Sequence, residues 1–106
     1  MTKDIYQLHA EVCRSLSHAK RLEILDILRD AEVSVGNIVK TMRISKANVS
    51  QHLAILRTAG ILKTRREGVT IFYRISSSKV TKACDLMREV LVEQRIRRDS
   101  MLKQLK

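Results

Sequence analysis

The apolar residues of this chain mostly recur at intervals of three and four positions, the period of a helix with one buried face. This pattern predicts helices over residues 3–15, 19–29, 34–42, 45–58 and from 77 or 78 to about 97. Residues 61–66 and 69–76 flank the turn sequence Glu67-Gly68, which predicts two strands joined as a hairpin. The expected order is four helices, two strands and a last helix.

Only a short turn separates the third and fourth predicted helices. Arg43 and Ile44 form this turn, and the hydroxyl of Ser45 is placed to cap the fourth helix. Gly60 follows that helix at the position where a glycine often ends a helix. This spacing is typical of a helix-turn-helix, and a hairpin after it forms a wing. We therefore predict an all-α fold with a small β-hairpin wing, a winged helix-turn-helix.

The fourth helix has two contrasting faces. Val49, Leu53 and Leu56 recur at helical spacing and face a core. The other face, called here the recognition face, is small or amide-bearing and consists of Ala47, Asn48, Ser50, Gln51, Ala54 and Thr58. A solvated helix would carry Glu and Lys there, whereas small residues and amides let the backbone approach DNA and reach base edges. No acidic residue occurs between Glu32 and Glu67, which favours contact with phosphate.

Composition points to the same kind of partner. The 106 residues form one domain by size, residues 1–106, and carry a formal charge of +10. Residues 45–74 account for half of this charge, with six basic residues against Glu67 alone. A polyanion is the expected partner, most commonly nucleic acid. Three aromatic residues are too few for the stacking platforms of a single-strand binder.

Other function classes are disfavoured by what the sequence lacks. Three scattered histidines, with no glycine-rich phosphate loop and no nucleophile motif, argue against an enzyme, and no cofactor is expected. No apolar run is long enough for a membrane span, and residues 1–4 do not begin a signal peptide. We expect a cytoplasmic protein in which Cys13 and Cys84 start reduced, without a structural disulfide.

Several motifs in order resemble the ArsR/SmtB family over roughly residues 5–95. They are Leu16 to Leu25 (LSHAKRLEIL), Val49 to Leu53 (VSQHL), Gly60-Ile61-Leu62 and Arg65-Arg66-Glu67-Gly68. The resemblance implies a homodimeric winged-helix repressor that dimerises through its first and last helices and leaves double-stranded operator DNA when an inducer binds. It also implies DNA contacts by the recognition helix and the wing, at Ser45, Lys46, Asn48, Ser50, Gln51, His52, Arg65 and Arg66.

Two common inducer sites of that family are missing from this sequence. Where arsenic- and cadmium-type members carry Cys-Val-Cys, this chain has Ser34-Val35-Gly36, which offers no soft-metal ligand. At the zinc-type positions it has Ser77, Lys79 and Val90, and only Glu93 is suitable. We therefore expect neither site to bind metal.

The role of the two cysteines stays open among three alternatives. Cys13 and Cys84 lie on the apolar stripes of the first and last helices, so they can be small buried residues of a dimer interface. They can instead form a dithiol switch for sulfur species or oxidant, as in some family members. With His9 they can also supply a metal or metalloid site, the weaker alternative.

Other residues also carry two interpretations. His52 is either structural or a DNA contact, and the resemblance favours the contact. Residues 95–106 are expected to form a frayed tail. The resulting hypothesis is a repressor that binds a pseudo-palindromic operator as a homodimer and responds to a small inducer. An interaction module on a winged helix, without an inducer, is the remaining alternative.

Overall fold

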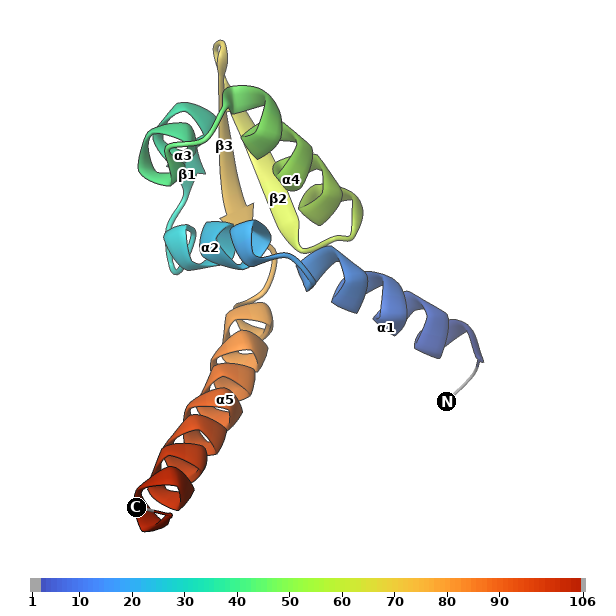
Figure 1. Ribbon diagram of the computed structural model, residues 1–106. Coiled ribbons are helices and arrows are strands. Elements are labelled where there is room, and N and C mark those ends of the chain that lie inside the picture. The colour runs from blue at the N-terminus through green and yellow to red at the C-terminus, as the bar shows by residue number, and fades with distance from the viewer. Residues whose placement is uncertain (1–2, 106) are drawn as a thin grey trace.

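The computed structural model describes residues 3–105, and its helices and hairpin follow the predicted order (Figure 1). The elements are α1 (Lys3–Leu16), α2 (Ala19–Ile27), β1 (Val33–Ser34), α3 (Val35–Met42), α4 (Lys46–Thr58), β2 (Leu62–Glu67), β3 (Thr70–Ile75) and α5 (Ser78–Gln104). The winged helix-turn-helix prediction is confirmed. The two hairpin strands begin and end within one residue or so of their predicted bounds, as is usual for such assignments.

Local side-chain and backbone geometry explains where the central helices begin and end. The hydroxyl of Ser45 accepts a 3.2 Å hydrogen bond from the backbone N–H of Asn48, which caps α4 as predicted. Ser34 caps α3 in the same way. Arg43 ends α3 in the left-handed region, with φ of 58°, and this reversal turns the chain into α4. Gly60 has φ of 80° directly after α4, a conformation that glycine adopts without strain.

The core is aliphatic and lies between α2, α3, α4 and the start of the hairpin. The predicted stripe of α4 is confirmed, because Val49, Leu53 and Leu56 have no exposed surface. The other buried core residues are Ile24, Leu25 and Leu28 near α2, Ile38 in α3, and Ile61 and Leu62 at the hairpin. Because these three residues of α4 are buried, the rotation of the helix about its axis is fixed, and its recognition face points outward.

The sheet has a third strand that the sequence did not predict. Its order is β1-β3-β2, with both pairs antiparallel. In β1, Val33 pairs with Tyr73 and Ser34 with Phe72. A two-residue strand has no periodicity of its own, and its partner lies far along the chain, so local pattern analysis assigned Ser34 only to the start of the next helix.

The last helix is longer than predicted. It continues to Gln104, so the predicted end near Arg97 is wrong, and residues 95–104 are helical where a frayed tail over residues 95–106 was expected. This stretch contains neither glycine nor proline, and Arg95 and Asp99 form an i,i+4 ion pair of 3.5 Å. Both features favour continued helix.

The elements divide the molecule into two ends. The N-terminal end of α4 and the tip of the hairpin lie together at one end, while α1 and α5 project from the other and diverge (Figure 1). Both projecting helices expose large apolar side chains, among them Ile5, Tyr6, Leu8, Leu86, Met87, Val90, Leu91 and Val92. None of the helices within residues 3–105 is long and apolar enough to cross a bilayer.

Candidate nucleic-acid interface

The recognition face of α4 is exposed and free of acidic side chains. Asn48, Ser50 and Gln51 are all exposed, and so is Lys46 in the first turn. Between and beside the two amides lie small residues, which leave space for a groove wall to approach. The face therefore offers donors and acceptors suited to base edges, together with a positive charge at the helix N-terminus.

Ser45 has a defined role in this arrangement. Its hydroxyl oxygen is used as the N-cap of α4, accepting from the Asn48 N–H. The side chain is itself exposed, at the same end of the helix as Lys46. Ser45 thus orders the first turn, from which backbone N–H groups point outward toward an anion.

His52 lies differently from the other predicted contacts. It is half-buried, and its Nδ1 accepts a 3.3 Å hydrogen bond from Nε of Arg21. Its ring centroid is 4.5 Å from that of His18, which caps α2. Burial lowers the pKa of His52, and electrostatic interactions with His18 and Arg21 lower it further. The neutral ring thus holds α4 against the junction of α1 and α2.

Sequence reasoning did not identify the partners of His52. Arg21 also donates a 3.0 Å hydrogen bond to the carbonyl of Ser15, the only buried polar residue among those described. The cluster of His18, Arg21 and His52 therefore joins three helices. The sequence did contain a signal for this contact. His18 and Arg21 lie in the motif LSHAKRLEIL and His52 lies in VSQHL, two of the motifs that resemble the ArsR/SmtB family.

The two wing arginines have different surroundings. Arg65 donates to Glu32 through Nε (3.0 Å) and Nη2 (2.7 Å), and to Glu67 through Nη1 (2.8 Å). Its guanidinium also lies 4.6 Å from the centre of the Phe72 ring. The hydrogen bond from Arg65 lowers the pKa of Glu32, which keeps this carboxylate ionised. The charge of Arg65 is thus compensated within the protein.

Arg66 lies on the opposite face of the hairpin, which is the face that carries buried Leu62. It is exposed and takes part in no ion pair within residues 3–105. The same holds, within the described part of the chain, for the other basic residues of this region: Lys46, Arg57, Lys63 and Arg74. Positive charge therefore remains available at the recognition helix and along the wing, mainly through residues other than Arg65.

Both cysteines border one apolar groove between α1 and α5. The groove has a volume of about 680 Å³, and Val12, Leu16, Met87 and Leu91 are among the residues that line it. Cys13 is exposed, Cys84 is half-buried, and both thiols are free. His9 lines the same groove. Within residues 3–105, however, no three His, Cys, Asp or Glu side chains come together to hold a metal ion, so a single chain does not assemble the alternative site of His9, Cys13 and Cys84.

Comparison with known proteins identifies the family. The family model described as bacterial regulatory protein, arsR family, matches residues 18–64, from the cap of α2 into β2. The transcriptional activator HlyU of Vibrio cholerae is 38% identical over 77 residues, which cover 73% of this chain and 71% of HlyU. The chain belongs to the ArsR family. It is accordingly a DNA-binding transcriptional regulator and not an enzyme.

Other ArsR-family relatives extend the comparison. The biofilm growth-associated repressor of Xylella fastidiosa is 33% identical over 85 residues, covering 80% of this chain and 75% of the repressor. A solution structure from Mycobacterium bovis, described as a homodimeric winged helix-turn-helix DNA-binding domain, has a TM-score of 0.80 and 28% identity. It covers 89% of this chain and 90% of that one. The relatives thus include an activator and a repressor on one fold.

Proposed function

We propose that this ArsR-family regulator acts in the cytoplasm as a homodimeric repressor that occupies a pseudo-palindromic operator and leaves it when its thiols react. The observation that carries the DNA-binding part is the exposed, acid-free recognition face of α4, which lies at the same end of the molecule as the basic wing (Figure 1). Repression follows from operator occupancy where the site overlaps a promoter.

The DNA contacts divide by chemistry. Asn48 and Gln51 are assigned to base edges, since an amide pairs with adenine through both its donor and its acceptor. Ser45, Lys46 and Ser50 surround the first turns of α4 and are assigned to the phosphate backbone there. Arg66 is the wing contact to phosphate. His52 and Arg65, whose polar groups are engaged inside the protein, position the helix and the wing.

Dimerisation through α1 and α5 follows from their exposed apolar side chains. Leu8, Met87 and Leu91 are each more than half exposed in one chain. A patch of this kind is typical of an interaction surface, and the similar protein from Mycobacterium bovis is described as homodimeric. A two-fold dimer would present two copies of α4 to half-sites about one helical turn of DNA apart.

The base-reading assignment is tested on a duplex selected by the wild-type protein from a random-sequence library. Replacing Gln51 by Ala should weaken binding and relax sequence preference by about 1 to 3 kcal/mol, because an amide paired with a base is lost. Gln104→Ala is the matched control, since Gln104 is an exposed amide at the far end of α5, away from the face of Met87 and Leu91. Fluorescence anisotropy that shows equal affinity for Gln51→Ala and wild type would remove Gln51 from the interface.

The inducer proposal rests on the groove that both thiols line. Hydrogen peroxide can oxidise the two thiols to a disulfide and is itself reduced to two water molecules. A persulfide R–S–SH can do the same, with R–SH and hydrogen sulfide as the products. If each cysteine first takes the outer sulfur of a persulfide, with R–SH leaving, the two cysteine persulfides can join as a trisulfide bridge with loss of hydrogen sulfide. Either bridge would draw α1 and α5 together, within a chain or across the dimer. Zinc should not release the repressor from its operator, because Lys79 and Val90 stand where zinc-type family members carry metal ligands.

The switch is tested by operator release. Polysulfide, peroxide, arsenite, cadmium and zinc are compared on wild type, Cys13→Ser and Cys84→Ser. We expect polysulfide or peroxide to release wild type only, with the bridge visible by mass and by non-reducing gel. Unchanged release from both variants would reduce Cys13 and Cys84 to packing residues, and release by arsenite or cadmium alone would favour a metal site shared between chains.

A further inference from the structure

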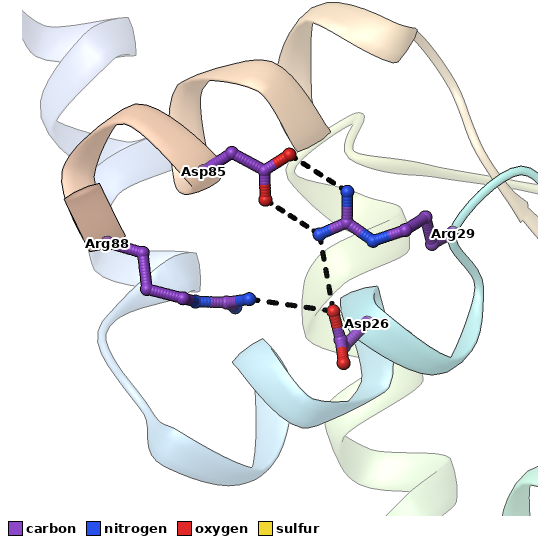
Figure 2. Close-up of polar contacts among 4 residues, drawn as sticks. All are labelled: Asp26, Arg29, Asp85 and Arg88. Carbon is purple, nitrogen blue, oxygen red and sulfur yellow. Dashed lines mark hydrogen bonds and ion pairs between the residues drawn. The ribbon is translucent and has the colours of Figure 1, made fainter.

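Four charged side chains join α2 to α5 (Figure 2). Arg29 donates to both carboxylate oxygens of Asp85, from Nη1 at 2.9 Å and from Nη2 at 2.7 Å. The same Nη2 lies 3.2 Å from Oδ1 of Asp26, and Nη1 of Arg88 lies 3.6 Å from that oxygen. These residues, Asp26, Arg29, Asp85 and Arg88, are called here the α2–α5 clamp.

The two sides of the clamp have the same pattern. Each contributes an aspartate and, three residues later, an arginine: Asp26 with Arg29, and Asp85 with Arg88. Each arginine contacts an aspartate of the other side, so positive and negative groups alternate and the cluster is neutral. The hydrogen bonds from Arg29 lower the pKa of Asp85, which keeps this carboxylate charged at neutral pH. Arg29 also follows the C-terminal end of α2, where a cation is favoured by the helix dipole.

The position of the clamp on α5 is significant because little else holds that helix to the body. Val80 and Cys84, in its first two turns, pack against the core. Beyond the clamp the side chains are exposed, and the helix leaves the body (Figure 1). With 27 residues, α5 is about 40 Å long, so a small change of angle at the clamp moves its far end considerably.

We propose that the α2–α5 clamp sets the angle between α5 and the helix-turn-helix, and so the separation of the two recognition helices in the dimer. The inference rests on the proposed homodimer through α1 and α5. A bidentate arginine–carboxylate pair fixes orientation as well as distance. Because all four side chains are partly exposed, the clamp contributes little to stability and acts mainly on geometry.

The geometry can be measured without DNA. A single spin label is placed on α4 through Ala47→Cys, in a chain that also carries Cys13→Ser and Cys84→Ser. Dipolar spectroscopy on the dimer then gives the distance between the two α4 helices. We expect one narrow distance distribution for this parent, and a broader or shifted one after Asp85→Asn, which removes the charge but keeps the side-chain size.

A matched control lies on the same helix. Among the residues that the structure describes, Asp99 pairs only with Arg95, one turn away in α5, so Asp99→Asn removes the same charge without affecting the link to α2. We expect it to leave the distance distribution unchanged. The charge-reversed pair Arg29→Asp with Asp85→Arg should restore the narrow distribution, because the new arginine would face Asp26 and the new aspartate.

The same variants, without the label and the cysteine substitutions, are then tested on the selected duplex with its half-sites moved apart or together by one to three base pairs. Wild type should prefer one spacing. Asp85→Asn should bind the duplex with that spacing about fivefold more weakly per protomer and should no longer prefer it over the other spacings. Its affinity for random-sequence DNA and its thermal stability should change little. The charge-reversed pair should recover the preference, which a merely structural defect would not.

The outcomes separate the clamp from the homodimer itself. A parent protein that sediments as a monomer overturns the homodimer and the clamp with it. A dimeric parent in which Asp85→Asn and Asp99→Asn give the same distances and the same spacing preference overturns the clamp alone. Failure of the charge-reversed pair to recover either readout, in a folded dimer, also overturns it.

Discussion

At the scale of single residues, the adjacent arginines of β2 have different surroundings. Arg65 is neutralised by Glu32 and Glu67, while Arg66 makes no ion pair within the described chain. We therefore expect Arg66→Ala to weaken specific and random-sequence DNA alike and to lower the salt slope of binding by about one unit per protomer. Arg65→Ala should change the slope less, because its charge is already compensated. Anisotropy titrations at several salt concentrations compare the two directly, and equal slopes would contradict these assignments.

We expect His52 to make the fold sensitive to acid. Its folded-state pKa lies below the usual 6.5, so the unfolded chain takes up a proton first as pH falls. Stability from the neutral ring is therefore present above about pH 6.5 and is lost below it. We expect His52→Asn, which keeps an acceptor for Arg21, to flatten the fall in melting temperature between about pH 7 and about pH 5. A melting temperature that falls as steeply with pH in His52→Asn as in wild type would contradict this role of His52.

At the scale of elements, α4 depends on its cap. Ser45→Ala removes the acceptor for the Asn48 N–H and should cost about 0.5 to 2 kcal/mol of unfolding free energy. Operator affinity should fall as well, since the first turn carries the proposed phosphate contacts. Urea denaturation followed by circular dichroism measures the stability term. Ser100→Ala, on the exposed surface near the C-terminal end of α5, should be close to neutral in the same assay. An equal loss of stability there would contradict the capping role of Ser45.

The elements also show how far sequence reasoning reaches. The core stripe of α4, its Ser45 cap and Gly60 were predictable because each depends on residues within a turn or two. Strand β1 was missed because its two residues are defined only by pairing with β3. The prediction ended helix α5 too early because the polar composition of residues 95–106 was interpreted as a sign of fraying. Local pattern alone does not separate a solvated helix from a disordered tail.

The candidate site follows the same rule. The exposure of Asn48 and Gln51 could be predicted, since it follows from the buried stripe on the other side of one helix. The pairing of Arg65 with Glu32 could not, because the two residues meet only when the hairpin packs beside β1. The contact of His52 with Arg21, and the α2–α5 clamp, likewise depend on tertiary packing.

At the scale of the whole molecule, DNA binding should require the apolar surface of α5. Leu91 is 57% exposed in one chain and lines the groove beside Cys84. We expect Leu91→Glu to yield monomers in analytical ultracentrifugation and to lose most operator affinity, because a charge at a buried interface is costly and half-sites need two linked recognition helices. Ser100→Glu places the same charge on the opposite face of α5 and should remain dimeric. A monomeric wild-type protein would contradict this assembly.

The length of α5 bears on how long a newly made chain survives. Beyond Leu91 the helix is exposed throughout the described residues, and it carries trypsin-type cleavage sites at Arg95, Arg97, Arg98 and Lys103. A helix with so few contacts to its own domain opens locally at low cost, and proteases cut such openings in proportion to their population. Pairing with a second copy would suppress this opening. Turnover of the regulator would then fall as its concentration rises, so that its steady-state level depends on its own assembly.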